Sequence, residues 1–168
     1  MNSIEPPALD GVGLVPPPPE LRLLARFTVE LTSDPWDLGP TTGAGRRRIV
    51  PITGGSFAGP GFNGDILDVG ADWQIVADGL TSIDTRYLLR TDDHALISLH
   101  THGYRHGPPE VMARLAKGEH VDPTDYYFRI QLAFETASPE YGWLARTMAV
   151  GSALRLPEAV VYDAYLVG

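Results

Sequence analysis

The chain has 168 residues, of which 43% are hydrophobic and 20% are charged, and this ordinary globular composition excludes a chain that is disordered throughout. Asp and Glu outnumber Lys and Arg by 21 to 13, giving a formal net charge of −8, which repels nucleic-acid phosphates and anionic lipid headgroups. The chain has no cysteine, so disulfides, thiolate nucleophiles and cysteine-ligated metals are excluded. We therefore expect a folded protein without nucleic acid or membrane as a partner.

The N-terminal 20 residues are predicted to form a Pro-rich arm, because they end in four consecutive prolines, 16–19, which favour polyproline II. Residues 21–168 are then expected to form one domain. The segment before the prolines has no basic residue ahead of an apolar run, unlike a secretory signal. No apolar stretch approaches the roughly 18 residues that a membrane helix requires, so we expect a cytoplasmic protein.

Alternation of apolar and polar residues predicts strands along most of the domain. Leu23, Ala25, Phe27, Val29 and Leu31 share one face of the first strand. Residues 34–48 contain Pro and Gly breaks and are expected to form a loop. Further strand-like runs cover residues 73–76, 81–90, 95–101, 126–135, 143–150 and 160–167.

One short helix is predicted at residues 108–117, where a proline stands near the start and Gly118 follows the end. The remaining elements are seven or eight strands with frequent turn signals. Such a pattern favours an all-β fold, and we predict an antiparallel β-barrel of about eight strands. Barrels of this size can hold one small ligand.

Several motifs resemble a known family when they are taken in order. They are the glycine-rich run 54–60 with Gly64, the segments 70–74, 84–87, 91–93, 103–105 and 121–129, and Trp143-Leu144. Together they resemble the family called domain of unknown function 3237, or uncharacterised protein family 0311. The resemblance implies a small antiparallel β-barrel that is usually a homo-oligomer, without an established general activity.

Two departures from the family pattern draw attention to histidines. The hairpin has Asp93-His94 where Asp-Gly is expected, and one strand carries His100-Thr101-His102. His100 and His102 point to the same face of a strand, and with His106 they could ligate a metal. Alternatively, His102 could act alone as a general acid or base, or the pair could simply end a strand at the surface.

Charged residues occupy strands whose other face is apolar. Asp72, Arg86, Arg129 and Glu135 belong to this set, and period two alone cannot decide whether they face solvent or a ligand-holding lumen. In a lumen the two arginines would stabilise developing negative charge and a carboxylate would act as base. On the outer face they would form ion pairs in solvent.

Aromatic residues supply a further set of candidates. Trp73, Tyr87 and Trp143 are expected to contact a flat, apolar ligand together with Asp72 and His100. Tyr127 shares its strand face with polar residues and is a candidate proton donor. The other large rings are expected to fill the core.

These observations lead to three hypotheses. The first is a cofactor-independent isomerase, cyclase or lyase that binds an apolar, oxygenated small molecule, with catalytic residues His102, Glu135, Arg129, Arg86 and Tyr127 and with no metal. The second is a non-catalytic barrel that carries a hydrophobic ligand in a dry lumen. The third is a metal enzyme that uses His100, His102 and His106.

Overall fold

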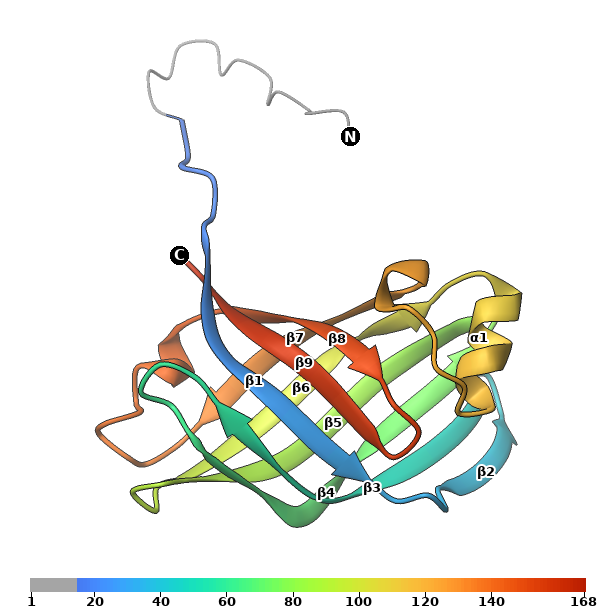
Figure 1. The fold of residues 1–168 in the computed structure, drawn as a ribbon, viewed down its shortest axis with the longest axis horizontal. Coiled ribbons are helices and arrows are strands. Elements are labelled where there is room, and N and C mark those ends of the chain that lie inside the picture. The colour runs from blue at the N-terminus through green and yellow to red at the C-terminus, as the bar shows by residue number, and fades with distance from the viewer. Residues whose placement is uncertain (1–14) are drawn as a thin grey trace.

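The computed structural model describes residues 15–168, in which the strands form one antiparallel sheet that closes on itself (Figure 1). Around the barrel the strands are β1 (Leu21–Leu31), β9 (Ala159–Val167), β8 (Ala149–Arg155), β7 (Tyr127–Glu135), β6 (Leu96–His106), β5 (Leu80–Thr91), β4 (Gly64–Ala77) and β3 (Gly45–Ala58). Closure comes from pairing of β1 with β3, and β2 (Trp36–Thr41) adds to the other part of β3. The predicted all-β barrel of about eight strands is confirmed.

Helical structure is confined to short segments. The predicted helix is present as α1 (Pro109–Ala116), and its C-terminal Gly118 has a φ of 74°, a conformation that glycine adopts without strain. Two 3-10 turns follow, η1 (Pro123–Asp125) and η2 (Leu144–Arg146). In the described part of the chain, every helix is too short or too polar for a membrane crossing.

Three local predictions are corrected by the structure. The predicted loop at residues 34–48 contains β2 and the start of β3. Leu23 is exposed and Leu24 is buried in its place, because the register of β1 against β9 shifts between Leu23 and Ala25 and such a bulge reverses the alternation. Trp143 precedes η2, and strand β8 begins only at Ala149.

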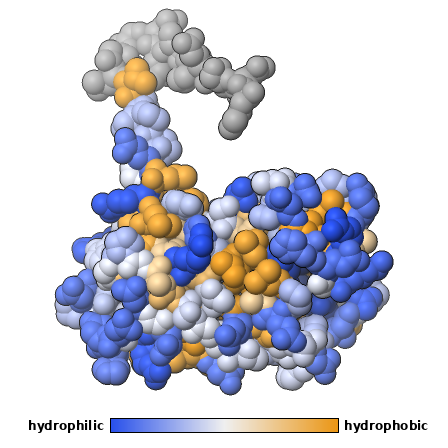
Figure 2. Space-filling view, in the orientation of Figure 1, coloured by the Kyte–Doolittle hydropathy of each residue, from blue (hydrophilic) through white to orange (hydrophobic). Residues whose placement is uncertain are grey.

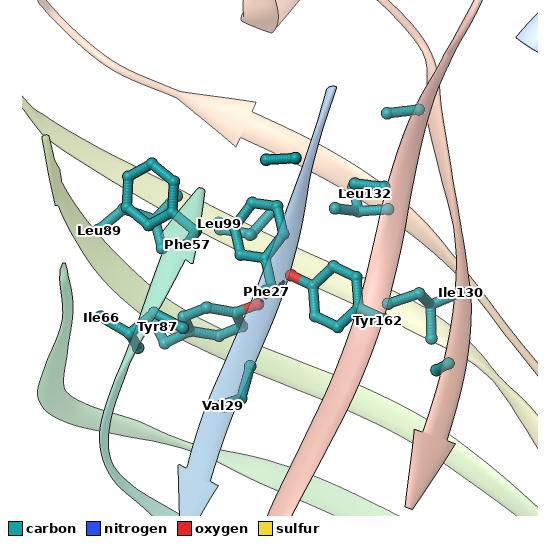
Figure 3. Packing of buried hydrophobic residues seen from close by; sticks show 14 of the residues in the cluster. Phe27, Val29, Phe57, Ile66, Tyr87, Leu89, Leu99, Ile130, Leu132 and Tyr162 are labelled. Atoms are coloured by element: carbon teal, nitrogen blue, oxygen red, sulfur yellow. Dashed lines mark hydrogen bonds between the residues drawn. The ribbon is translucent and has the colours of Figure 1, made fainter. Parts of the chain in front are cut away.

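The inside of the barrel is closed at one end by stacked aromatic rings. Phe27 lies between Phe57, at 5.3 Å between ring centroids, and Tyr162, at 4.7 Å. Phe62 contacts Phe57 at 4.7 Å. Leucine and isoleucine side chains complete this packing (Figure 3), so the apolar end of the interior is filled by the chain itself.

The outer surface is mostly polar, with a cluster of apolar residues over β8 and β9 on the face that Figure 2 shows. In the register of these strands, Leu154 pairs with Val161 and both are partly buried. Residues 15–20 of the predicted Pro-rich arm are exposed and contain no helix or strand. Residues 1–14 of the arm lie outside the described residues.

The seam at which β1 pairs with β3 supplies a first testable prediction. Gly55 has a φ of 132°, and a Cβ atom there would lie 2.0 Å from the Thr28 carbonyl oxygen across the seam. Gly55→Ala should therefore lower the free energy of unfolding by more than about 3 kcal/mol. Gly61 has a φ of 72° but open space around it, so Gly61→Ala should cost only about 1–2 kcal/mol. Urea unfolding of both variants measures the difference, and equal costs would contradict the role of the seam.

A candidate site inside the barrel

Polar side chains gather inside the barrel, on the inner faces of β4, β5 and β6. Asp72 and Gln74 point inward from β4, Thr85 from β5 and Thr101 from β6, and all four are at most 7% exposed. Asp72 pairs with Thr85 across β4 and β5, and Thr85 pairs with Thr101 across β5 and β6. The register of three neighbouring strands therefore places these groups side by side.

Asp72 is the buried acid of this cluster. Its Oδ2 accepts a hydrogen bond of 2.6 Å from the Gln74 amide, while Oδ1 is buried and has no partner among the described residues. Burial raises the pKa of the Asp72 carboxyl, and the Gln74 and Thr85 side chains and the charge of Arg105 only partly oppose this effect. Asp72 thus keeps its proton to higher pH than an exposed aspartate does.

Two tyrosines meet beside this cluster. The hydroxyl groups of Tyr87, on β5, and Tyr162, on β9, form a hydrogen bond, and both side chains are buried (Figure 3). Desolvation raises the pKa of both phenols above their ordinary value. The pair therefore stays neutral at physiological pH and offers hydroxyl groups rather than a phenolate.

The lumen contains two small cavities. The inner cavity, of about 30 Å³, is lined by Asp72, Thr85, Tyr87 and Tyr162 among others. The second cavity, which we call the mouth pocket, has about 190 Å³ and lies between the barrel and α1, with Thr81 and Arg105 in its lining. Thr81 and Thr85 share the inner face of β5. The two cavities therefore follow one another along the inner face of β5, and they share no lining residue.

All five residues that were predicted to catalyse the reaction lie outside the lumen. The outer face carries Arg86 on β5, His102 on β6, and Tyr127, Arg129 and Glu135 on β7. The physical reason is that the apolar members of each alternating strand face the barrel interior, so their polar neighbours must face solvent. The expectation that these five side chains converge in a lumen is thus wrong.

The predicted ligand-contacting residues divide between the two faces. Asp72 and Tyr87 face the lumen, as expected. Trp73 is 46% exposed and Trp143 is 38% exposed, and His100 is partly buried on the outer face, where Nε2 lies 2.6 Å from Asp84 Oδ1. Trp73, Trp143 and His100 therefore do not face the lumen, where contacts with a ligand were expected.

Three of the displaced residues meet on the outer surface. His102, Tyr127 and Arg129 line an open groove of about 560 Å³. The Arg129 guanidinium lies 5.4 Å from the Tyr127 ring, which also stacks on His106. These groups are solvated, whereas the lumenal groups lie in a region of low dielectric where electrostatic effects on a reaction are larger.

The histidine cluster does not assemble as a metal site. His100 and His102 share one face of β6 with His106, but no group of three or more His, Asp or Glu side chains within residues 15–168 has the geometry to hold a metal ion. His94 occupies a turn with a φ of 68°, which explains why glycine is expected at that position.

Comparison with known proteins agrees with this architecture. Residues 19–167 match the family model described as "Protein of unknown function (DUF3237)". The chain belongs to the DUF3237 family. The resemblance that the sequence motifs indicated is thereby confirmed.

Several known proteins are similar to the chain in sequence or in fold. A β-barrel-like protein from Acinetobacter baumannii is 58% identical in its crystal structure, which covers 92% of this chain and 99% of its own with a TM-score of 0.81. A UPF0311 protein from Rhodopseudomonas palustris is 43% identical over 74% of this chain and 82% of its own length. A more distant relative, "Hydroalkoxylation enzyme phnH" from Penicillium herquei, is 28% identical over 90% of this chain and 85% of its own length.

The raised pKa of Asp72 predicts how Asp72→Asn changes stability with pH. An acid whose pKa is raised in the folded state costs no stability at a pH where it is protonated in both the folded and the unfolded chain. As pH rises above the pKa of the unfolded chain, the free energy of unfolding falls. Asp72→Asn removes this cost. The variant should unfold at a temperature similar to that of the parent near pH 4 and several degrees higher near pH 7.5. A constant difference across this pH range would contradict the assignment.

The tyrosine pair predicts a coupled loss of stability. Tyr162→Phe leaves the buried Tyr87 hydroxyl without its partner, at a cost of about 1–3 kcal/mol. The double variant Tyr87→Phe, Tyr162→Phe should cost less than the sum of the two single variants, because no buried hydroxyl is then left unpaired. Denaturant unfolding of all four proteins measures this coupling, and additive costs would show that the two hydroxyls do not depend on each other.

Proposed function

We propose that this protein is a cofactor-independent enzyme that moves one proton within a small, apolar, oxygenated molecule bound in the lumen, with Asp72 as acid and base. The observation that carries the proposal is the buried carboxyl with a raised pKa and an unpartnered Oδ1. Buried acids of this kind are typical of catalytic sites. The name of the distant Penicillium herquei relative supports the same class of chemistry.

The reaction that fits these groups is an intramolecular addition of a hydroxyl group to a carbon–carbon double bond. Asp72 gives its proton to one alkene carbon, and the substrate oxygen forms a bond to the other carbon. The hydroxyl proton then returns to the Asp72 carboxylate. The product is a ring-closed isomer of the substrate, and the step consumes no oxidant, reductant or second molecule.

The neighbouring side chains have distinct roles in this proposal. The Gln74 amide holds one carboxyl oxygen of Asp72, which leaves the other oxygen for the substrate. The rings of Tyr87, Phe128 and Tyr162 line the inner cavity, and their faces stabilise positive charge that develops on the protonated alkene. The inner cavity has room for only the reacting end of a substrate, so the rest of the molecule would occupy the mouth pocket.

The hypothesis of a hydrophobic-ligand carrier fits the lumen less well. A carrier requires a cavity that is dry and apolar throughout. Here the apolar end of the barrel is filled by Phe27, Phe57 and Phe62, and the inner cavity of about 30 Å³ has a carboxyl group and hydroxyls among its otherwise apolar lining. The interior is therefore better suited to chemistry than to storage.

The proposal predicts turnover of phenols that carry an alkenyl group next to the hydroxyl. The wild-type protein should convert at least one member of such a panel into its ring-closed isomer, and in D₂O the product should gain one deuterium on carbon. Asp72→Asn should reduce the rate by about 100-fold or more, since general acid–base catalysis contributes about 10²–10⁴. Chromatography with mass spectrometry measures both results.

Two further variants separate the lumen from the outer face. Asp65 lies on the same strand as Asp72 but is exposed, so Asp65→Asn should retain full activity. Glu135→Gln removes the carboxylate that the sequence alone favours. Loss of activity in Glu135→Gln, with retention in Asp72→Asn, would move the reaction to the outer face of β7. A panel in which no alkenyl phenol is consumed would overturn the proposed reaction class.

A further inference from the structure

Three arginines surround the mouth pocket between the barrel and α1. Arg48 comes from β3, Arg105 from β6 and Arg155 from β8, and all three line the cavity of about 190 Å³. Its other lining residues are Val76, Gly79, Thr81, Met112, Leu115 and Ala116. Within residues 15–168, this lining contains no acidic side chain. The pocket therefore combines three basic side chains with an apolar part.

Arg105 is the most deeply buried of the three arginines. Only 9% of the residue is exposed, and its Nε and Nη1 atoms have no hydrogen-bond partner among the described residues. Its guanidinium lies 5.4 Å from the centre of the Phe128 ring. This contact provides no hydrogen-bond acceptor for the N–H donors. A buried guanidinium with unpaired donors is costly, so the site calls for an acceptor that the described chain does not supply.

The other two arginines increase the positive charge of the pocket. Arg155 donates from Nη1 to the Ala159 carbonyl and from Nη2 to the Pro157 carbonyl, both at about 3 Å. Burial, together with the nearby charges of Arg105 and Arg48, lowers the pKa of Arg155 to about 10. Asp72 is the carboxyl that attracts Arg105, and burial raises the pKa of that carboxyl.

We propose that the mouth pocket binds the carboxylate of a small, otherwise apolar organic acid. The carboxylate would accept hydrogen bonds from the unpaired donors of Arg105, with Arg48 and Arg155 adding electrostatic attraction. The apolar part would pack against Val76 and the Met112 and Leu115 side chains of α1. An apolar wall favours a carboxylate attached to a hydrocarbon over a fully hydrated phosphate.

This inference deepens the proposed function, on which it rests in one respect: the organic acid would be the substrate of the Asp72 reaction. The substrate class then becomes an alkenyl hydroxy acid whose carboxylate is anchored at the mouth while its alkene reaches the inner cavity. Binding of the carboxylate is a property of the pocket alone. It can therefore be measured without any turnover.

The test is calorimetric titration of the full-length protein with benzoate, with its neutral analogue benzamide and with inorganic phosphate. Benzoate should bind with a stoichiometry of one, and it should bind at least tenfold more tightly than the other two. Arg105→Met should weaken benzoate binding by about 10- to 100-fold, the range expected for a lost charged hydrogen bond. The melting temperature of unliganded Arg105→Met should equal or exceed that of the parent, because the buried unpaired charge is removed.

A matched control uses Arg90, which is exposed on β5 and pairs with Asp65. Arg90→Met removes the same charge and should leave benzoate binding unchanged. Equal affinity for benzoate and benzamide, or no effect of Arg105→Met, would overturn the carboxylate site. Phosphate binding as tightly as benzoate would overturn the preference for an apolar acid.

The two proposals can fail separately. If benzoate binds as expected while Asp72→Asn leaves turnover of alkenyl phenols unchanged, the carboxylate site stands and the catalytic role of Asp72 falls. If alkenyl phenols are turned over through Asp72 while benzoate does not bind, the carboxylate site falls alone.

Discussion

Closure of the sheet by β1 and β3 is the constraint on which the rest of the structure depends. Once the seam forms, alternate residues of the barrel strands point into one enclosed lumen and their neighbours point outward. A single register therefore decides which residues lie in a low-dielectric interior and which lie in water. The same charged residue type has a different chemistry on the two faces, as the exposed Asp65 and the buried Asp72 on β4 show.

The lumen is divided along its axis into an apolar part and a polar part. The aromatic rings around Phe27 provide contact area and stability at one end. Asp72, Gln74 and Arg105 oppose stability, because each is buried and Asp72 and Arg105 have unpartnered polar atoms. The interior therefore combines an apolar part that stabilises the fold with a polar part that costs stability, and the proposed binding and chemistry use the polar part.

Much of the fold could be predicted from the sequence, because period two survives in most strands. β7 alternates without a break, and the turn at Asp92 to His94 is located by its residues alone. The sequence could not place β2, whose residues include Pro and Gly, and it could not locate the bulge near Leu23, where pairing with β9 shifts the register. Bulges depend on partner strands that are distant in the sequence.

The candidate site was only partly predictable. Asp72 and Tyr87, named as expected ligand contacts, face the lumen, whereas His102, Arg129 and Glu135, named as catalytic candidates, lie on the outer face. Alternation identifies two faces of a strand without saying which one is enclosed. Arg105 was missed, although it continues the inward series of Ile97, Leu99 and Thr101 on β6. Arg105 could have been recognised as a charged residue at an inward position of β6. This recognition requires that the apolar face of the strand is first assigned to the interior.

The two charged groups of the lumen have opposite pKa shifts, and this opposition links binding to proton transfer. Burial favours the neutral form of both Asp72 and Arg105, while each attracts the charged form of the other. In the proposed complex a substrate carboxylate replaces Asp72 as the negative partner of Arg105. Asp72 then loses the interaction that favours its ionised form, and the new negative charge raises its pKa further. Binding of the acid would thus prepare the proton that the reaction consumes.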